Sequence, residues 1–115
     1  MIRPVSPVFL ESMVAHAVSM GDLVSVHFRN PGVDGSNEIP VERQRTTWGP
    51  VVITDCAQSE GSECAFELPG EVTCTHFGVW SPTGFLYGGV VDPPFTTKVD
   101  GGTLFLTPSY QEIPE

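Results

Sequence analysis

The alternation of hydrophobic and polar positions is longest in residues 71–91, where two extended runs flank a turn. On one face of the first run lie Val72, Cys74, His76, Gly78 and Trp80. The second run, Phe85 to Val91, returns after a Ser-Pro-Thr-Gly segment at 81–84, where proline presets φ and glycine accepts a positive φ. This pattern predicts a β-hairpin around which the rest of the chain is organised. Glycines inside these runs (Gly78, Gly88 and Gly89) indicate a bulge or the close approach of another backbone.

A helical spacing of apolar residues appears at residues 10–20. One face of the predicted helix carries Leu10, Met13, Val14, Ala17 and Val18, with Met20 as a further candidate. Gly21 follows as a natural end, because glycine readily adopts the conformation that closes a helix. Residues 1–9 contain two prolines, and we expect them to form an extended arm.

The remaining chain consists of short runs separated by proline and glycine. The expected strands are 22–29, 51–54, 63–68, 95–99 and 103–107, with an extended segment at 38–47. Residues 55–62 resemble a loop, Asp92-Pro93-Pro94 ends the second arm of the hairpin, and residues 108–115 form a polar tail. Because most connections are short, we expect antiparallel sheets. The predicted fold is mainly β: a small antiparallel β-sandwich or flattened barrel with one short N-terminal helix, formed by a single domain of residues 10–107.

Size and charge restrict the classes of partner. The chain has 115 residues, enough for one domain that buries roughly two-thirds of its unfolded surface. Its formal net charge is −9 with five basic residues, so we expect no binding to nucleic acid or to anionic membranes. No apolar run approaches the ~20 residues that span a bilayer. The N-terminus shows no signal-peptide pattern, and we expect synthesis in a cytosol.

Three residues raise the question of a metal site. If residues 63–68 paired with the central stretch as a hairpin, Cys64 would lie opposite Cys74, with His76 two residues further on. That arrangement allows a metal-binding domain built on Cys64, Cys74 and His76, or a Cys64–Cys74 disulfide. A fourth metal ligand is not evident, and buried cysteine is ordinarily a small apolar residue. We therefore favour free thiols and expect no cofactor.

Other chemistry is weakly represented. The sequence contains no G-x-S-x-G motif and no phosphate-binding loop, so we expect a protein that is not an enzyme. Four aromatic residues could form a carbohydrate-binding platform on a host surface: Trp48, Trp80, Phe85 and Tyr87. Packing in the core is the interpretation we favour for them, with Trp48 and Trp80 as the candidate surface aromatics.

Two blocks cover about half of the chain. The first, LVSVHFRNPGVDGSNEIPVERQ (Leu23 to Gln44), is a strand followed by a polar turn, Asn-Glu and Arg-Gln. The second is VTCTHFGVWSPTGFLYGGVVDPPFTTKVDGGTLFL (Val72 to Leu106). In this order and spacing, the blocks resemble a family of small virion proteins of tailed bacteriophages, particularly phages of actinobacteria. Its members are labelled tail-fibre-like, minor tail or head-decoration proteins.

The resemblance is carried by short patterns. The first block is similar to V-S-L-H-T-x-D-P-G-x-x-G-x-N-E-V, and its matches are Asn30-Pro31-Gly32, Gly35, Asn37-Glu38 and Arg43-Gln44. The second is similar to V-T-H-x-G-L-W-D-A … G-x-x-L-x-x-G-x-L-x-x-P … G-D-T-L. Its matches are Thr75-His76, Gly78, Trp80, Gly84, Leu86, Gly88, Pro93 and Thr103-Leu104. Phe28-Arg29 and the short turn at 81–83 depart from the patterns.

The resemblance implies a virion structural protein without catalytic residues. We expect it to be made in the cytoplasm of a host bacterium and to assemble as a homo-oligomer, with a trimer as one option. It would join other virion proteins, either the major capsid protein or tail proteins. The arm at 1–9 and the tail at 108–115 would clamp neighbouring subunits. The expected assembly contacts are Met1, Ile2, Val5, Val8, Phe9 and Ile113.

Overall fold

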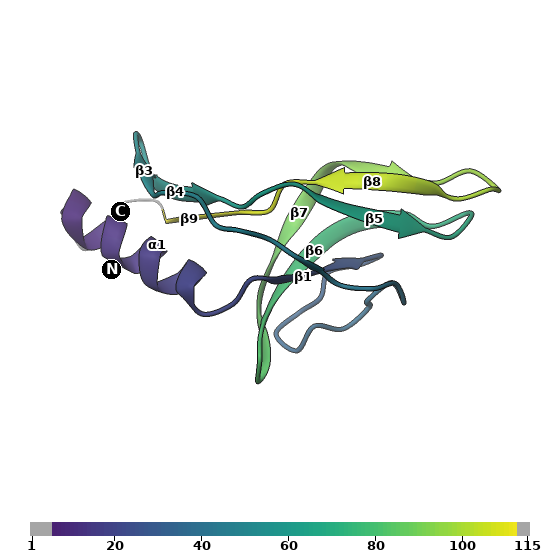
Figure 1. The fold of residues 1–115 in the computed structure, drawn as a ribbon, viewed down its shortest axis with the longest axis horizontal. Helices are drawn as coiled ribbons and strands as arrows, with labels where there is room; N and C mark the ends of the chain where they lie inside the picture. The colour runs from purple at the N-terminus through teal and green to yellow at the C-terminus, as the bar shows by residue number, and fades with distance from the viewer. Residues whose placement is uncertain (1–5, 113–115) are drawn as a thin grey trace.

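The structure is a computed structural model that describes residues 6–112. The described chain forms an elongated molecule with a helix at one end and the paired strands β5 and β8 at the other (Figure 1). The elements are α1 (Pro7–Ser19), β1 (Leu23–His27), β2 (Gln44–Arg45), β3 (Val52–Ile53), β4 (Ala57–Glu60), β5 (Cys64–Leu68), β6 (Thr73–Ser81), β7 (Gly84–Thr96), β8 (Gly102–Leu106) and β9 (Ser109–Glu112).

The predicted fold class is confirmed. The protein is mainly β with one helix in the described chain, and its strands pair antiparallel in a small sandwich-like arrangement. A four-stranded sheet has the order β2-β1-β6-β7, a three-stranded sheet the order β3-β4-β9, and β5 pairs with β8. Each sheet therefore joins segments that are far apart in the sequence.

The central hairpin is formed by β6 and β7, as predicted. Its ladder closes at Ser81 opposite Gly84 and extends to Thr73 opposite Thr96. The predicted break at residues 92–94 and the separate strand at 95–99 are wrong, because β7 continues to Thr96. β7 is an edge strand of its sheet, where proline is tolerated because its missing N–H faces no further strand.

A β-bulge changes the predicted faces of β6. The register shifts between Cys74 and His76, so one additional residue interrupts the alternation. As a result Cys74, Phe77 and Val79 all point into the same core, although strict alternation would separate Cys74 from the other two. The bulge also removes His76 from that face, since neighbouring residues beyond it alternate normally.

Residues 63–68 do not pair with the central stretch, which was the condition for placing Cys64 opposite Cys74. Strand β5 pairs with β8 instead, with Cys64 opposite Leu106 and Phe66 opposite Leu104. After β5 the chain turns toward the 98–101 segment, where the Glu71 amide donates to the Lys98 carbonyl. This turn separates β5 from β6, so the two strands belong to different sheets.

Helix α1 begins earlier than predicted. The proposed extended arm at 1–9 is wrong for its last three residues, because the helix starts at Pro7. The Ser6 hydroxyl accepts a hydrogen bond from the Phe9 amide, and Pro7 has no N–H to leave unpaired in the first turn. At the other end Gly21 lies against the Trp80 carbonyl, where a Cβ atom has no room.

Two segments predicted to be irregular are strands. Residues 57–60 were expected in a loop and residues 109–112 in a polar tail, yet they pair as β4 and β9. In β4 the buried positions are Ala57 and Ser59, which alternate with more exposed polar residues. Small and polar residues at inward positions leave no apolar signal, and this explains why the alternation was missed.

The described chain has two hydrophobic cores. The larger lies between the four-stranded sheet and the β5–β8 pair, with Val24, Phe66 and Val79 among its buried residues. The smaller lies between α1 and the β3-β4-β9 sheet, and consists of Leu10, Val14, Val18 and Ala57. Trp48 packs against both cores and connects the helical end of the molecule to the sandwich.

Candidate functional site: a buried polar cluster, an apolar helix surface and a pocket

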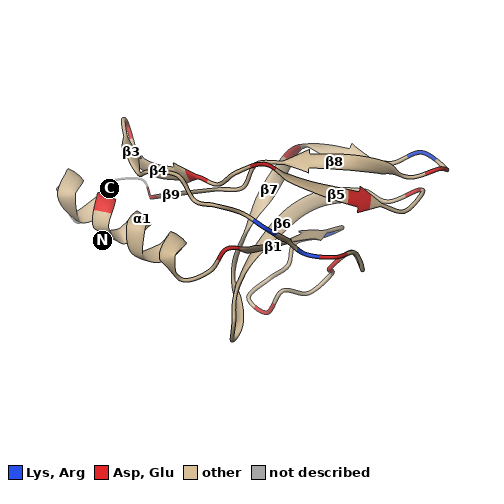
Figure 2. Cartoon of the chain, viewed as in Figure 1, with Lys and Arg blue, Asp and Glu red and all other residues tan. Residues whose placement is uncertain are grey.

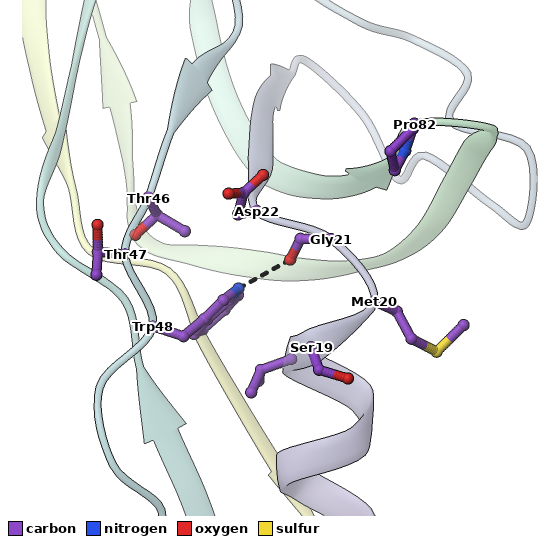
Figure 3. Close-up of a pocket in the computed structure, with 9 residues that line it drawn as sticks. Ser19, Met20, Gly21, Asp22, Thr46, Thr47, Trp48 and Pro82 are labelled. Atoms are coloured by element: carbon purple, nitrogen blue, oxygen red, sulfur yellow. Dashed lines mark hydrogen bonds between the residues drawn. The ribbon is translucent and has the colours of Figure 1, made fainter.

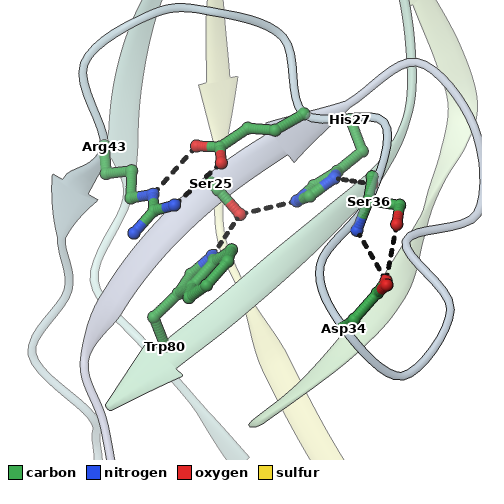
Figure 4. A network of polar contacts seen from close by, with 7 residues as sticks. Ser25, His27, Asp34, Ser36, Arg43 and Trp80 are labelled. Carbon is green, nitrogen blue, oxygen red and sulfur yellow. Dashed lines mark hydrogen bonds and ion pairs between the residues drawn. The ribbon is translucent and has the colours of Figure 1, made fainter. Parts of the chain in front are cut away.

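A polar cluster lies buried between β1 and β6. The Trp80 indole N–H donates to the Ser25 hydroxyl at 2.8 Å, and Ser25 Oγ lies 2.6 Å from His27 Nε2. His27 Nδ1 lies 2.8 Å from the Ser36 carbonyl oxygen (Figure 4). Because a carbonyl only accepts, Nδ1 carries the proton, and Nε2 of the neutral ring accepts from Ser25. Each donor in this series of hydrogen bonds, from Trp80 through Ser25 and His27 to Ser36, therefore has an acceptor.

Burial keeps His27 neutral. The side chain has no exposed surface, and burial lowers the pKa of its imidazole below the ordinary value, more strongly than the Ser36 carbonyl and Glu38 raise it. Ser25 is 1% exposed. A serine next to a histidine suggests nucleophilic catalysis, but a substrate has no access to this pair. The cluster stabilises the fold, and sequence reasoning missed it because Ser25 and His27 show only an ordinary strand pattern.

Trp80 is held by this cluster and is not an open platform. Its ring is covered by the Arg43 guanidinium, which lies 3.7 Å from the ring centroid. Arg43 also forms a two-pronged ion pair with Glu38, with Nε and Nη2 at 2.9 and 2.8 Å from the two carboxylate oxygens. Phe85 packs edge-on against the same indole. This supports the packing interpretation of Trp80 and removes it from the predicted aromatic platform.

The proposed metal ligands do not come together. Cys64 lies opposite Leu106 and Cys74 opposite Phe95, so the assumed cross-strand contact is absent. The His76 imidazole is instead hydrogen-bonded to the Thr75 hydroxyl. Among residues 6–112, no group of three or more His, Cys, Asp and Glu side chains is placed to hold a metal ion, and all three cysteines are free thiols.

Helix α1 exposes apolar side chains as well as burying them. Leu10, Val14 and Val18 face the smaller core, whereas Phe9, Met13 and Met20 are 47%, 37% and 47% exposed. The exposed three recur at helical spacing along one line, which we call the α1 apolar stripe. Within α1 the only Asp, Glu, Lys or Arg residue is Glu11, and Figure 2 shows the helix otherwise without charge.

The structure places two of the six predicted assembly residues. Val8 and Phe9 are 75% and 47% exposed and lie in the first turn of α1, next to or within the stripe. Met1, Ile2, Val5 and Ile113 lie outside the described residues. The stripe also contains Met13 and Met20. The sequence pattern placed Met13 on the apolar face of the helix, with Met20 as a further candidate, but both side chains are exposed.

A pocket of about 390 Å³ lies where the end of α1 meets the segment around Trp48 (Figure 3). Trp48 is fixed there by a 2.9 Å hydrogen bond from its indole N–H to the Gly21 carbonyl. The lining residues are Val18, Ser19, Met20, Gly21, Asp22, Thr46, Thr47, Trp48 and Pro82. Trp48 was a candidate surface aromatic, and the structure places it in a pocket without Trp80.

Within residues 6–112, these features define a small, mainly β protein with two cores, an exposed apolar surface on the helix and a pocket lined by Trp48. Comparisons with protein-family models, curated proteins and solved structures find no match to this chain. In the described part of the chain, no helix combines the length and apolar character needed to cross a membrane.

Proposed function

We propose that this protein is a non-enzymatic structural component of a tailed-bacteriophage virion. In this proposal it assembles as a symmetric homo-oligomer, a trimer being the simplest ring, on the capsid surface or on the tail. The observation that carries the proposal is the α1 apolar stripe. Exposed apolar residues at helical spacing lose contact with water only when another surface covers them, which favours association.

Charge supports a second copy as the covering surface. The chain carries a net charge of −9, so most contacts between two copies would bring carboxylates together. The stripe lies on the helix that carries Glu11 as its single charged residue, apart from His16 near its end. Two copies that meet through α1 therefore bury apolar surface while keeping their acidic residues apart.

The two sequence blocks add support from within the fold. They meet in the buried cluster: Ser25, Glu38 and Arg43 belong to the first block, and Gly78 and Trp80 to the second. Four of these residues, Glu38, Arg43, Gly78 and Trp80, are among those that carry the resemblance, and their contacts are structural. No reactive group in the cluster is open to a substrate.

The test is to locate the chain in purified particles of the phage that encodes it. Heads and tails are separated, and the chain is quantified against the major capsid protein by mass spectrometry. Hundreds of copies in the head fraction would identify a decoration protein, and a few copies in the tail fraction a minor tail or fibre-like subunit. Absence from both fractions would overturn the proposal.

A matched pair of variants connects this test to the stripe. A phage encoding Phe9→Ser with Met13→Ser should incorporate less of the protein. Val33→Ser provides the control, because Val33 is 96% exposed in a loop away from α1. If both variants are incorporated equally, the α1 apolar stripe is not needed for assembly into the particle.

A further inference from the structure

We propose that the pocket between the end of α1 and Trp48 binds a neutral saccharide. This inference does not depend on the virion role, because it is tested with isolated protein and shares only Met20 with the α1 apolar stripe. The pocket combines one aromatic wall with carboxylate and hydroxyl groups, and this combination matches a sugar ring, which has apolar C–H faces and a hydroxyl rim.

The aromatic wall is fixed before any ligand arrives. The Trp48 indole N–H is already bonded to the Gly21 carbonyl, so the ring can offer a ligand only its carbon surface. Met20 and Pro82 extend the apolar lining from the end of the helix and from the β6–β7 turn. A side chain held by a hydrogen bond and by packing against two cores loses little entropy on binding.

The polar groups lie on the same pocket lining. One oxygen of the Asp22 carboxylate is paired with Arg45, and its second oxygen has no hydrogen-bond partner within residues 6–112. Thr47 also lines the pocket, but its side chain points away from Asp22 and Met20 (Figure 3), and the Thr46 hydroxyl is already donated to the Ser62 carbonyl. Asp22 is therefore the side chain best placed to bond the hydroxyl groups of a ligand.

The charge of the lining selects among ligands. Asp22 disfavours phosphates and carboxylates, and Arg45, the one nearby cation, is already engaged with it. Organic cations such as quaternary ammonium groups are typically enclosed by several aromatic rings, whereas this pocket has a single one. A volume of about 390 Å³ lies at the small end for ligand sites and suits one or two sugar rings.

The experiment uses the full ¹⁵N-labelled chain and its two tryptophan indole N–H signals. The probes are neutral methyl hexopyranosides, N-acetylglucosamine and the corresponding neutral di- and trisaccharides. We expect one probe to shift the Trp48 indole signal to saturation, with a Kd of about 1 mM or below. The Trp80 signal should stay in place, because Trp80 does not line the pocket.

Variants separate a built site from a chance contact. Trp48→Phe removes one indole signal and so assigns both. Asp22→Asn should weaken binding about tenfold while the protein stays folded. The Asp22 side chain is 44% exposed, so this variant keeps the test valid if Trp48→Phe does not fold. Ser12→Ala, on the exposed part of α1, serves as the control and should bind normally.

Each outcome decides the proposal. Tighter binding of the trisaccharide than of the hexoside would indicate a surface glycan, and equal binding a single sugar, and either result supports the site. The proposal is overturned if no probe shifts the Trp48 signal at about 10 mM. It is also overturned if choline shifts that signal at lower concentration than every saccharide, or if Asp22→Asn binds as the wild type does.

Discussion

The hydroxyl of Ser25 and the Nε2 atom of His27 lie 2.6 Å apart in a site without solvent access. Both residues belong to strand β1, where one residue stands between them in the sequence. Side chains at positions i and i+2 of a strand share a face, so β1 alone brings them together. Strand β6 then supplies the Trp80 N–H to Ser25, and the turn before Asn37 supplies the Ser36 carbonyl to His27. The relationship makes His27 a neutral structural residue and leads to the first three predictions.

Removing the Ser25 hydroxyl should destabilise the protein. Ser25→Ala leaves the Trp80 indole N–H and His27 Nε2 without their partner in a buried site, and we expect a loss of about 2 kcal/mol in the free energy of unfolding. Urea unfolding followed by tryptophan fluorescence measures the change. Ser12→Ala is the control and should change stability by less than about 0.5 kcal/mol, because Ser12 is exposed. Equal stability of the two variants would contradict the assigned hydrogen-bond chain.

Stability should fall on mild acidification because of His27. Its pKa in the folded protein lies below the value of about 6.5 in the unfolded chain, so the unfolded state takes up a proton first as the pH falls. The stabilisation that comes from keeping His27 neutral is therefore complete well above about pH 6.5, the approximate pKa in the unfolded chain. It is lost as the pH falls through that value toward the lower pKa of the folded state. The free energy of unfolding should decrease between about pH 7.5 and 5.5.

The control for this pH effect is His27→Gln, which has no titrating ring at the position. Its stability should depend less on pH over the same interval than that of the wild type, and the difference between the two curves isolates His27. Parallel curves would show that His27 is protonated equally in the folded and unfolded states.

A methyl group at Gly78 should disturb the same cluster. A Cβ atom there would lie 2.7 Å from Ser25 Oγ and 2.8 Å from His27 Nε2, closer than real Cβ contacts allow. We expect Gly78→Ala to lower the free energy of unfolding by about 2 kcal/mol. Gly84→Ala is the matched control, because nothing lies within 4 Å of its Cβ position and it does not adopt a positive φ. Thermal unfolding of both variants checks the contrast.

Self-association should depend on the outer side of α1 and stability on its inner side. Phe9→Ser with Met13→Ser should shift sedimentation equilibrium toward monomer with little change in the free energy of unfolding of the monomer. Val14→Ala should instead cost about 2 kcal/mol of stability, because Val14 is fully buried in the smaller core. Association that is unchanged in the double variant would rule out the stripe as the contact.

The three thiols should differ in reactivity. Cys64 and Cys74 are buried, and burial raises the pKa of both thiols, which disfavours the reactive thiolate. Cys56 is partly exposed. With a disulfide-forming chromogenic reagent at about pH 8, near the ordinary thiol pKa, we expect one thiol to react in the folded protein and three after unfolding. Fast reaction of a second thiol in the folded protein would contradict the burial of Cys64 and Cys74. A total of one reactive thiol after unfolding would show that these two cysteines form a disulfide.

Local patterns in the sequence were sufficient for several elements. The β6–β7 hairpin was predictable because the Ser-Pro-Thr-Gly turn and the flanking alternation are both local signals. The helix was predictable from its apolar spacing, although its start at Pro7 depended on Ser6 as a cap rather than on the prolines as a break. The mainly β, antiparallel class followed from many short runs with short connections.

By itself, the sequence determined most of the segments that extend, where the central hairpin turns and that the fold is mainly β, because these depend on neighbours along the chain. The tertiary structure decided which strands pair and which side chains meet. It paired β5 with β8, placed a bulge next to Cys74, and joined Ser25, His27 and Trp80 in one cluster. Among the described residues it also left the α1 apolar stripe exposed and formed an open pocket beside Trp48. Such contacts join residues tens of positions apart, and their free energies depend on packing that the local alternation of residues does not record.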